Sequence, residues 1–301
     1  MRVLLLAVLS LFSLYGLSHL FAPNIPTPAF WQQPLQIIAL EGGKLERPDN
    51  SLRALQASQE AGSHGFWLPL QLSLDQELVI NADASVDRTS NGTGDIKNMT
   101  LAQLRGLDIG YWWPYHDPQD LAKLYVPTNQ EFPFRGQGKQ MVSLAEVSEQ
   151  FPQQTLLLNL GEGQPNLRRA LSNYLQQQQL WSNTLLYIEQ QNNLNELRRL
   201  FPQAQTYATE AELRLLFVMQ ILRLEHLYPY RPSALLINLD QQQHSLLTTG
   251  MMRAAQRLNL GVYVLSTDVE AELIEELKLL GVQGLITAEP SKAAELVNRV
   301  Q

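Results

Sequence analysis

Three acidic residues are the side chains whose type and position could do chemistry in this chain. Glu41 and Glu162 follow directly on apolar runs, and Asp83 lies in the polar stretch that follows a further run. Carboxylates at the carboxyl ends of neighbouring parallel strands can share a divalent cation, which prefers oxygen ligands. The sequence therefore offers Glu41, Asp83 and Glu162 as a candidate cation or ligand site, with solvated loop carboxylates as the plainer interpretation.

The composition excludes several other kinds of chemistry. The 301 residues contain no cysteine, so disulfides, thiolate ligands and a cysteine nucleophile are all unavailable. The five histidines show no spacing typical of a zinc site. A formal net charge of −7 provides no basic surface for nucleic acid, which is therefore not expected as a partner.

Residues 1–23 are predicted to be a signal peptide or a membrane anchor. A short positive end precedes an apolar run over 3–17, which is shorter than the roughly 20 residues of a full span. Cleavage after Ser18 and an uncleaved anchor that extends to Phe21 remain alternatives. Residues 24–33 then form a linker, and the rest of the chain is expected to be exported, periplasmic or otherwise extracytoplasmic, with the membrane as a partner if residues 1–23 stay attached.

From residue 34 to residue 301, short apolar runs alternate with helical patterns, as in parallel strands joined by crossover helices. The predicted strands are Leu35–Leu40, Phe66–Ser73, Thr155–Leu160, Thr184–Glu189, Gln205–Thr209, Ala234–Leu239, Gly261–Ser266 and Gly284–Thr287. Eight such units favour a single-domain α/β fold, the (β/α)8 TIM barrel, with a doubly wound sheet as the rival. Residues 109–138, rich in aromatic residues and proline, interrupt the alternation and are predicted to be a self-packed insertion.

Four motifs between residues 38 and 110 keep a fixed order. They are Ile-Ala-Leu-Glu-Gly-Gly at 38–43, Arg-Pro-Asp-Asn-Ser at 47–51, Asp-Arg-Thr-Ser-Asn-Gly at 87–92 and Thr-Leu-Ala-Gln-Leu-Arg-Gly-Leu-Asp-Ile-Gly at 100–110. This order and spacing resembles the glycerophosphodiester phosphodiesterase family, whose members begin with Ile-Ala-His-Arg-Gly-Gly. The resemblance implies a TIM barrel and a phosphoric diester hydrolase of lipid metabolism. Such an enzyme uses Mg²⁺ or Ca²⁺, two histidines, an arginine and a lysine.

Position by position, the resemblance implies that this chemistry is missing here. The family's catalytic and phosphate-binding positions are occupied by Leu40, Glu41, Ala82 and Gly163. Its further metal-binding positions are occupied by Trp67, Pro69 and Gly161, so no metal cofactor is predicted. The residues that keep the family's identity or chemical type are predicted to be structural, with Arg88 pairing locally: Asp49, Asn50, Asp87, Arg88, Asn91 and Gly92.

Two functions remain open at this stage. One is a catalytically inactive, exported or membrane-anchored module that binds an unknown small molecule or protein. The alternative is an active phosphoric diester hydrolase with a site rebuilt around Glu41, Asp83 and Glu162. Trp67 then either lines an apolar pocket at the barrel mouth or plugs it, and Pro69 is expected to cause a bulge or a late strand start.

The segment Ala211–Leu227 is predicted to be a helix that is apolar over most of its circumference. Burial against the barrel and a neighbouring subunit is the interpretation we favour. Contact with lipid is the alternative, although the segment itself holds few basic residues.

Overall fold

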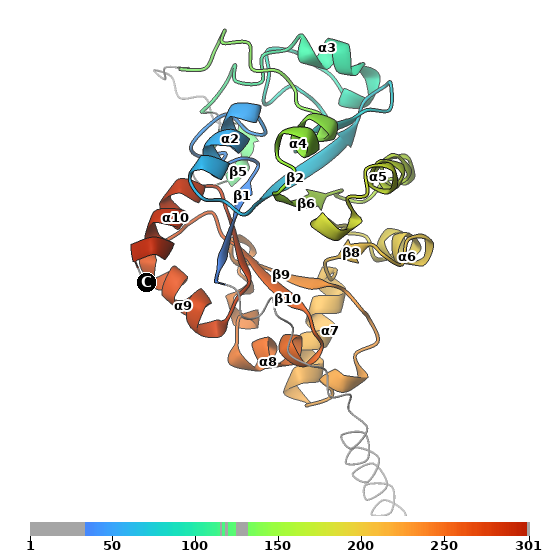
Figure 1. The fold of residues 1–301 in the computed structure, drawn as a ribbon, viewed down its shortest axis with the longest axis vertical. Coiled ribbons are helices and arrows are strands. Elements are labelled where there is room, and N and C mark those ends of the chain that lie inside the picture. Colours follow the sequence, from blue (N-terminus) through green and yellow to red (C-terminus); the bar gives the residue numbers. More distant parts are fainter. Residues whose placement is uncertain (1–33, 115, 118–119, 125–131, 300–301) are drawn as a thin grey trace, which may run out of the picture.

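Eight parallel strands form a closed barrel in the computed structural model, which describes residues 34–299 except 115, 118–119 and 125–131 (Figure 1). The strands are β1 (Gln36–Leu40), β2 (Gly65–Leu72), β6 (Thr155–Asn159), β7 (Thr184–Tyr187), β8 (Gln205–Thr206), β9 (Ala234–Asn238), β10 (Gly261–Leu265) and β11 (Gly284–Thr287). Their order in the sheet is β8-β7-β6-β2-β1-β11-β10-β9, and a parallel bridge from Tyr207 to Ala234 closes the ring. The predicted (β/α)8 barrel is confirmed, and the doubly wound sheet is wrong.

The two ends of the barrel differ in what they expose. The carboxyl ends of the strands form one end, which we call the mouth. The first residues of the strands form the other end, which we call the N-terminal face. Because each crossover helix runs back against its strands, the carboxyl ends of these helices also lie at the N-terminal face.

Helices cover the outside of the barrel between the strands, as the alternation of apolar runs with helical patterns predicts. They are α2 (Leu52–Glu60), α5 (Pro165–Gln177), α6 (Gln191–Leu200), α7 (Glu210–Ile221), α8 (Thr249–Arg257), α9 (Ala271–Leu280) and α10 (Pro290–Arg299). The α7 helix is shorter than predicted, because Arg223 adopts a φ of 57° and the chain continues in a separate 3₁₀ turn at Glu225–Leu227. The short elements that were not predicted include β3 (Leu78–Ile80), α3 (Leu101–Arg105) and α4 (Leu144–Gln150).

The expected bulge or late strand start at Pro69 is wrong, since β2 already begins at Gly65. Strand β2 keeps an unbroken parallel register with β6 from Gly65 to Pro69. The hydrogen-bonded pairing of β1 with β2 ends at Trp67. The backbone nitrogen of Pro69 faces the β1 side of the strand, beyond the end of this pairing, so its missing N–H breaks no hydrogen bond. Proline is tolerated there because no backbone acceptor on β1 needs its hydrogen bond.

The described part of the 109–138 insertion packs on itself. The rings of Trp113 and Phe134 lie 5.1 Å apart, and the guanidinium of Arg135 lies 4.3 Å from the ring of Tyr111 and 4.0 Å from that of Phe132. The insertion also contains a two-stranded antiparallel sheet of β4 (His116–Asp117) and β5 (Asp120–Leu124). Cation–π and edge-to-face contacts of this kind stabilise such a segment outside the main sheet. The insertion therefore supplies its own small core beside the mouth.

The predicted signal or anchor at 1–23 and the predicted linker at 24–33 lie outside the described residues. Among the residues that are described, no helix has both the length and the hydropathy of a membrane span.

Candidate functional site

The loop that follows β1 brings the first family motif to the mouth. Glu41 and Asn50 both adopt left-handed backbone conformations, with φ of 53° and 55°, and the Asn50 N–H donates to the Glu41 carbonyl at 2.8 Å. Gly42 follows with a φ of 79°, and a Cβ there would lie 3.0 Å from that of Ala54 on α2. The glycine is therefore required by the turn and by its contact with the helix.

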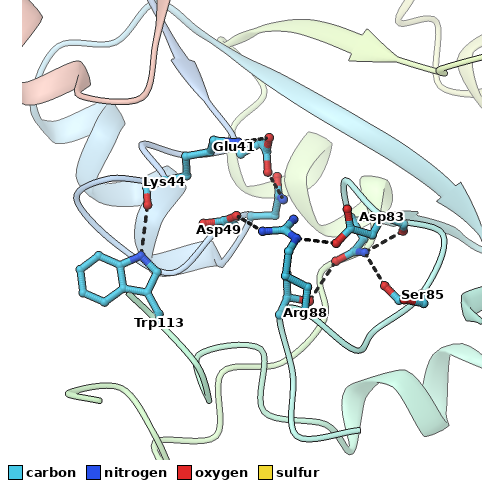
Figure 2. Close-up of polar contacts among 10 residues, drawn as sticks. Glu41, Lys44, Asp49, Asp83, Ser85, Arg88 and Trp113 are labelled. Atoms are coloured by element: carbon cyan, nitrogen blue, oxygen red, sulfur yellow. Dashed lines mark hydrogen bonds and ion pairs between the residues drawn. The ribbon is translucent and has the colours of Figure 1, made fainter. Parts of the chain in front are cut away.

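Glu41 and Lys44 form a buried ion pair at this loop (Figure 2). The Lys44 ammonium lies 3.0 Å from Glu41 Oε1, and the side-chain amide of Asn50 donates to Glu41 Oε2 at 3.3 Å. Burial disfavours the charged ammonium, but Glu41 and then Asp49 outweigh it, so the pKa of Lys44 is raised. Lys44 is therefore charged at neutral pH and neutralises Glu41.

Arg88 joins two aspartates from distant parts of the chain (Figure 2). Its Nε donates to Asp83 Oδ2 at 2.6 Å, and its Nη1 lies 3.8 Å from Asp49 Oδ2. The side chain of Asp49 is only 1% exposed and that of Arg88 only 10%. The predicted local pairing of Arg88 is present with Asp83, and the sequence did not predict the second pairing with Asp49.

The other family-like residues of this stretch hold turns together. The Gly94 N–H donates to Asp87 Oδ1 at 2.8 Å, and the Asp108 N–H donates to Asn91 Oδ1 at 2.9 Å. A Cβ on Gly92 would lie 2.7 Å from the side chain of Leu107. These contacts give the motif a structural role in the turns.

Trp67 lies inside the barrel, where the resemblance would place a metal-binding carboxylate. Its indole is 5% exposed and packs with Leu40 in the apolar interior. Its ring centroid lies 5.5 Å from that of Tyr187 and 5.9 Å from that of Tyr207, which in turn lies 5.6 Å from the ring of Tyr263. Four aromatic rings thus fill the barrel below the mouth.

The three tyrosines of this cluster stay neutral. Burial raises the pKa of Tyr207 well above its usual value, and burial also raises that of Tyr263. Burial, followed by the nearby Glu189 carboxylate, raises the pKa of Tyr187 to about 12. Sequence reasoning missed these tyrosines, although their place in or beside predicted strands gave a signal, because alternate strand residues point inward.

The remaining positions that the resemblance assigns to the family site are two glycines and an alanine. Gly161 and Gly163 lie in the turn after β6 with φ of 53° and 71°, and a Cβ on Gly163 would lie 2.8 Å from the side chain of Ile188. Ala82 lies in the bend after β3. A lysine side chain at Gly163 would therefore meet both backbone strain and a steric clash.

The candidate site at Glu41, Asp83 and Glu162 does not form a cation-binding cluster. Glu41 is paired with Lys44, Asp83 with Arg88, and the exposed Glu162 accepts from Gln164 at 3.1 Å. Within the described ranges, no group of three or more histidine, aspartate or glutamate side chains is arranged to hold a metal ion. The donor set at the mouth therefore does not fit the family's divalent cation.

We expect Trp67 to be shielded from solvent, as a plug and not as the wall of an open pocket. The chain holds five tryptophans, so the fluorescence of Trp67 is obtained as the difference between the wild type and Trp67→Phe. This difference signal is expected to be quenched by acrylamide only weakly, because the indole is 5% exposed. Quenching as strong as that of an exposed tryptophan would instead indicate an open apolar pocket.

Comparison with known proteins gives concordant results for sequence and fold. The Bacillus subtilis protein YhdW is 24% identical over 259 residues, which are 85% of this chain and 95% of the relative. A glycerophosphodiester phosphodiesterase of Caldanaerobacter subterraneus is 39% identical over 74 residues, a match that spans 30% of that relative's length.

Solved structures agree with the barrel. A glycerophosphoryl diester phosphodiesterase domain from Mycobacterium tuberculosis superimposes with a TM-score of 0.71 at 16% identity, over 87% of this chain and 99% of that one. An Oleispira antarctica phosphodiesterase, solved with the product sn-glycerol-3-phosphate, gives 0.63 at 21% identity over 89% and 99%. The glycerophosphoryl diester phosphodiesterase family model matches residues 41–292. The chain therefore belongs to the glycerophosphoryl diester phosphodiesterase family.

Proposed function

We propose that this protein is a family member without phosphodiesterase activity that works as an exported or membrane-anchored binding or partner module. The observation that carries the proposal is the set of residues at the family's reactive positions. Leucine and alanine stand where the resemblance places the two histidines, and neither transfers a proton. Tryptophan, proline and glycine stand where it places the carboxylates of strand two and strand three, and none of these side chains binds a cation.

The expected loss of reaction rate supports the absence of phosphodiesterase activity. Loss of one general acid or base costs roughly 10²- to 10⁴-fold in rate, and here both positions have changed. Loss of the metal further removes the charge that stabilises the transferring phosphoryl group and activates water. Binding energy at the mouth offers no replacement for these groups.

The charge distribution at the mouth also opposes a phosphate. Glu41 stands where the resemblance places an arginine, so this position offers an anion no positive charge. The two cations of the network, Lys44 and Arg88, are held by three carboxylates, those of Glu41, Asp49 and Asp83. These five side chains carry +2 and −3, so the network has a net charge of −1.

An active hydrolase with a rebuilt site is the second candidate function, and family membership over residues 41–292 favours it. Such a site would use Glu41 or Asp83 after release from their cationic partners. Because Glu41 is buried with Lys44, this release would also leave a buried ammonium without its carboxylate.

The purified full-length protein is expected to release no product from glycerophosphocholine above the no-enzyme blank. The assay is run with Mg²⁺ and with Ca²⁺, beside an active family member under the same conditions. Metal-dependent turnover that disappears in Glu41→Gln or Asp83→Asn would refute the proposal and establish the rebuilt site. Turnover that survives both changes would point to a contaminating hydrolase, which an independent purification of both variants would reveal.

A further inference from the structure

Helix α7 carries an apolar stripe that the barrel does not cover. Its buried side is formed by Leu213 and Leu216, whereas Leu215, Val218 and Ile221 are 37%, 50% and 60% exposed. Steps of three and four residues keep the exposed side chains on one face of the helix. We call the exposed residues the α7 patch: Leu215, Val218, Ile221, Leu222 and Leu227.

A groove rich in arginine lies directly beside this patch. It has a volume of about 530 Å³ between α7 and α8, and Ile221 of the patch lines it together with Arg223, Arg253 and Arg257. One carboxylate, that of Glu225, also lines the groove and pairs with Arg257. With three positive charges and one negative charge, the side chains that line the groove have a net charge of +2. The sequence alone did not predict this charge, because two of the arginines come from the next helix.

The C-terminal part of the patch lies at the N-terminal face, where the chain enters the barrel. Helix α7 runs antiparallel to the strands and ends at Ile221, and β1 begins at Gln36 at the same face. Figure 1 shows α7 and α8 as neighbours on the outside of the barrel. The apolar run within residues 1–23 therefore joins this face through a short connection. The linker 24–33, even fully extended, spans at most about 35 Å.

Exposed apolar side chains are concentrated on this part of the surface. Nine large hydrophobic side chains are exposed in the described part of the chain, and seven of them lie on α7, just after it, or at the carboxyl ends of α6 and α9. Besides the α7 patch they are Leu200, 51% exposed, and Leu279, 89% exposed. Only Leu45 and Leu74 lie towards the mouth. Apolar side chains gathered in this way mark an interaction surface more often than scattered single ones do.

We propose that the α7 patch and its arginine groove dock on a bilayer that contains anionic phospholipid. The apolar side chains lie at the boundary between headgroups and acyl chains, and Arg223 and Arg253 contact the headgroup phosphates. A second copy of the chain fits less well, because a two-fold contact would bring the two positive grooves together. The proposal concerns the outer surface of the barrel and holds whether or not the mouth has any activity.

Docking in this way fixes the orientation of the barrel. The mouth opens away from the bilayer, since it is formed by the opposite ends of the strands. The Glu41–Lys44 and Arg88 network would then face the aqueous phase, where a soluble partner reaches it.

The absence of cysteine makes a direct test simple. Full-length Ile221→Cys and Leu74→Cys variants, labelled with an environment-sensitive fluorophore, are added to phosphatidylcholine vesicles that contain phosphatidylglycerol. Leu74 is the matched control, because it is 55% exposed against 60% for Ile221 and lies at the other end of the barrel. The label at 221 is expected to shift to the blue and to be quenched by a lipid-attached nitroxide, whereas the label at 74 is not.

Charge reversal separates docking from simple tethering by residues 1–23. In the Ile221→Cys background, Arg223→Glu with Arg253→Glu is expected to abolish most of the quenching, since each arginine near an anionic surface contributes about fivefold in affinity. Circular dichroism melting checks that this variant is folded. Vesicles of phosphatidylcholine alone are expected to give the same loss.

Three results would overturn the proposal. Equal quenching at 221 and 74 would mean that the barrel has no fixed orientation. Equal quenching with and without phosphatidylglycerol would remove the role of the arginines. A blue shift at 221 that depends on protein concentration in the absence of vesicles would assign the patch to a second copy.

Discussion

Replacing Glu212 with alanine is expected to lower the free energy of unfolding by about 3–5 kcal/mol. The Glu212 side chain is completely buried and binds Arg198 through two bonds, Nη1 to Oε1 at 2.6 Å and Nη2 to Oε2 at 3.1 Å. The amide of Gln191 also donates to Oε1 at 2.6 Å. Removing the carboxylate leaves a largely buried guanidinium without its counter-ion, which is the costly way to break a buried pair.

A matched control lies two residues away on the same helix. Glu210 pairs with Arg214 on the surface, with side chains that are 57% and 72% exposed. Glu210→Ala is therefore expected to cost about 0–1 kcal/mol. Urea denaturation of both variants measures the difference in the free energy of unfolding. Similar losses of this free energy in the two variants would show that the buried pair stabilises the fold no more than the surface pair does.

The Glu212 pair matters because it supports the weakest part of the barrel. The sequence predicts a strand over Gln205–Thr209, but β8 is only two residues long, and Tyr207 closes the ring through an isolated bridge. Arg198 donates to the Thr206 hydroxyl at 2.9 Å and to the Tyr207 carbonyl at 3.1 Å. The pair thus links α6 and α7 to the strand that positions one of the four rings inside the barrel.

The strands were predictable because parallel strands buried on both faces give continuous apolar runs. The elements β3, α3 and α4 were missed because they are short, and β3 has only three residues with which to show a period. Capping boxes nevertheless marked two of them, at Thr100 with Gln103 and at Ser143 with Glu146. Attention to capping residues would have found α3 and α4, which long-range periodicity cannot detect.

The candidate site could be predicted only in part. The motifs indicate which residues occupy the family positions, because backbone features such as the φ of 79° at Gly42 keep a recognisable sequence. They do not indicate the partner of each side chain. Asp49 and Arg88 are 39 positions apart, and their contact depends on the paths of two loops that no local pattern encodes.

Arg88→Met is expected to lower the free energy of unfolding by about 3 kcal/mol, the low end of the range for a broken buried pair. The low end applies because the Asp83 side chain is 34% exposed and keeps access to water, whereas Asp49 is 1% exposed. The double variant Arg88→Met with Asp49→Asn is expected to recover part of the loss, since the amide carries no charge. Thermal and urea unfolding of the two variants and of Asp49→Asn complete the cycle.

Arg105→Met is the control for this cycle, because Arg105 pairs with Glu146 at 2.8 Å while both side chains remain 38% and 31% exposed. It is expected to cost no more than about 1 kcal/mol. If Arg88→Met leaves stability unchanged, the arginine does not stabilise the fold, and its presence at the mouth would need a ligand to explain it. If stability falls and the double variant recovers, the Asp-Arg motif is retained because it neutralises Asp49. The contribution of Arg88 to folding then suffices to explain this part of the motif.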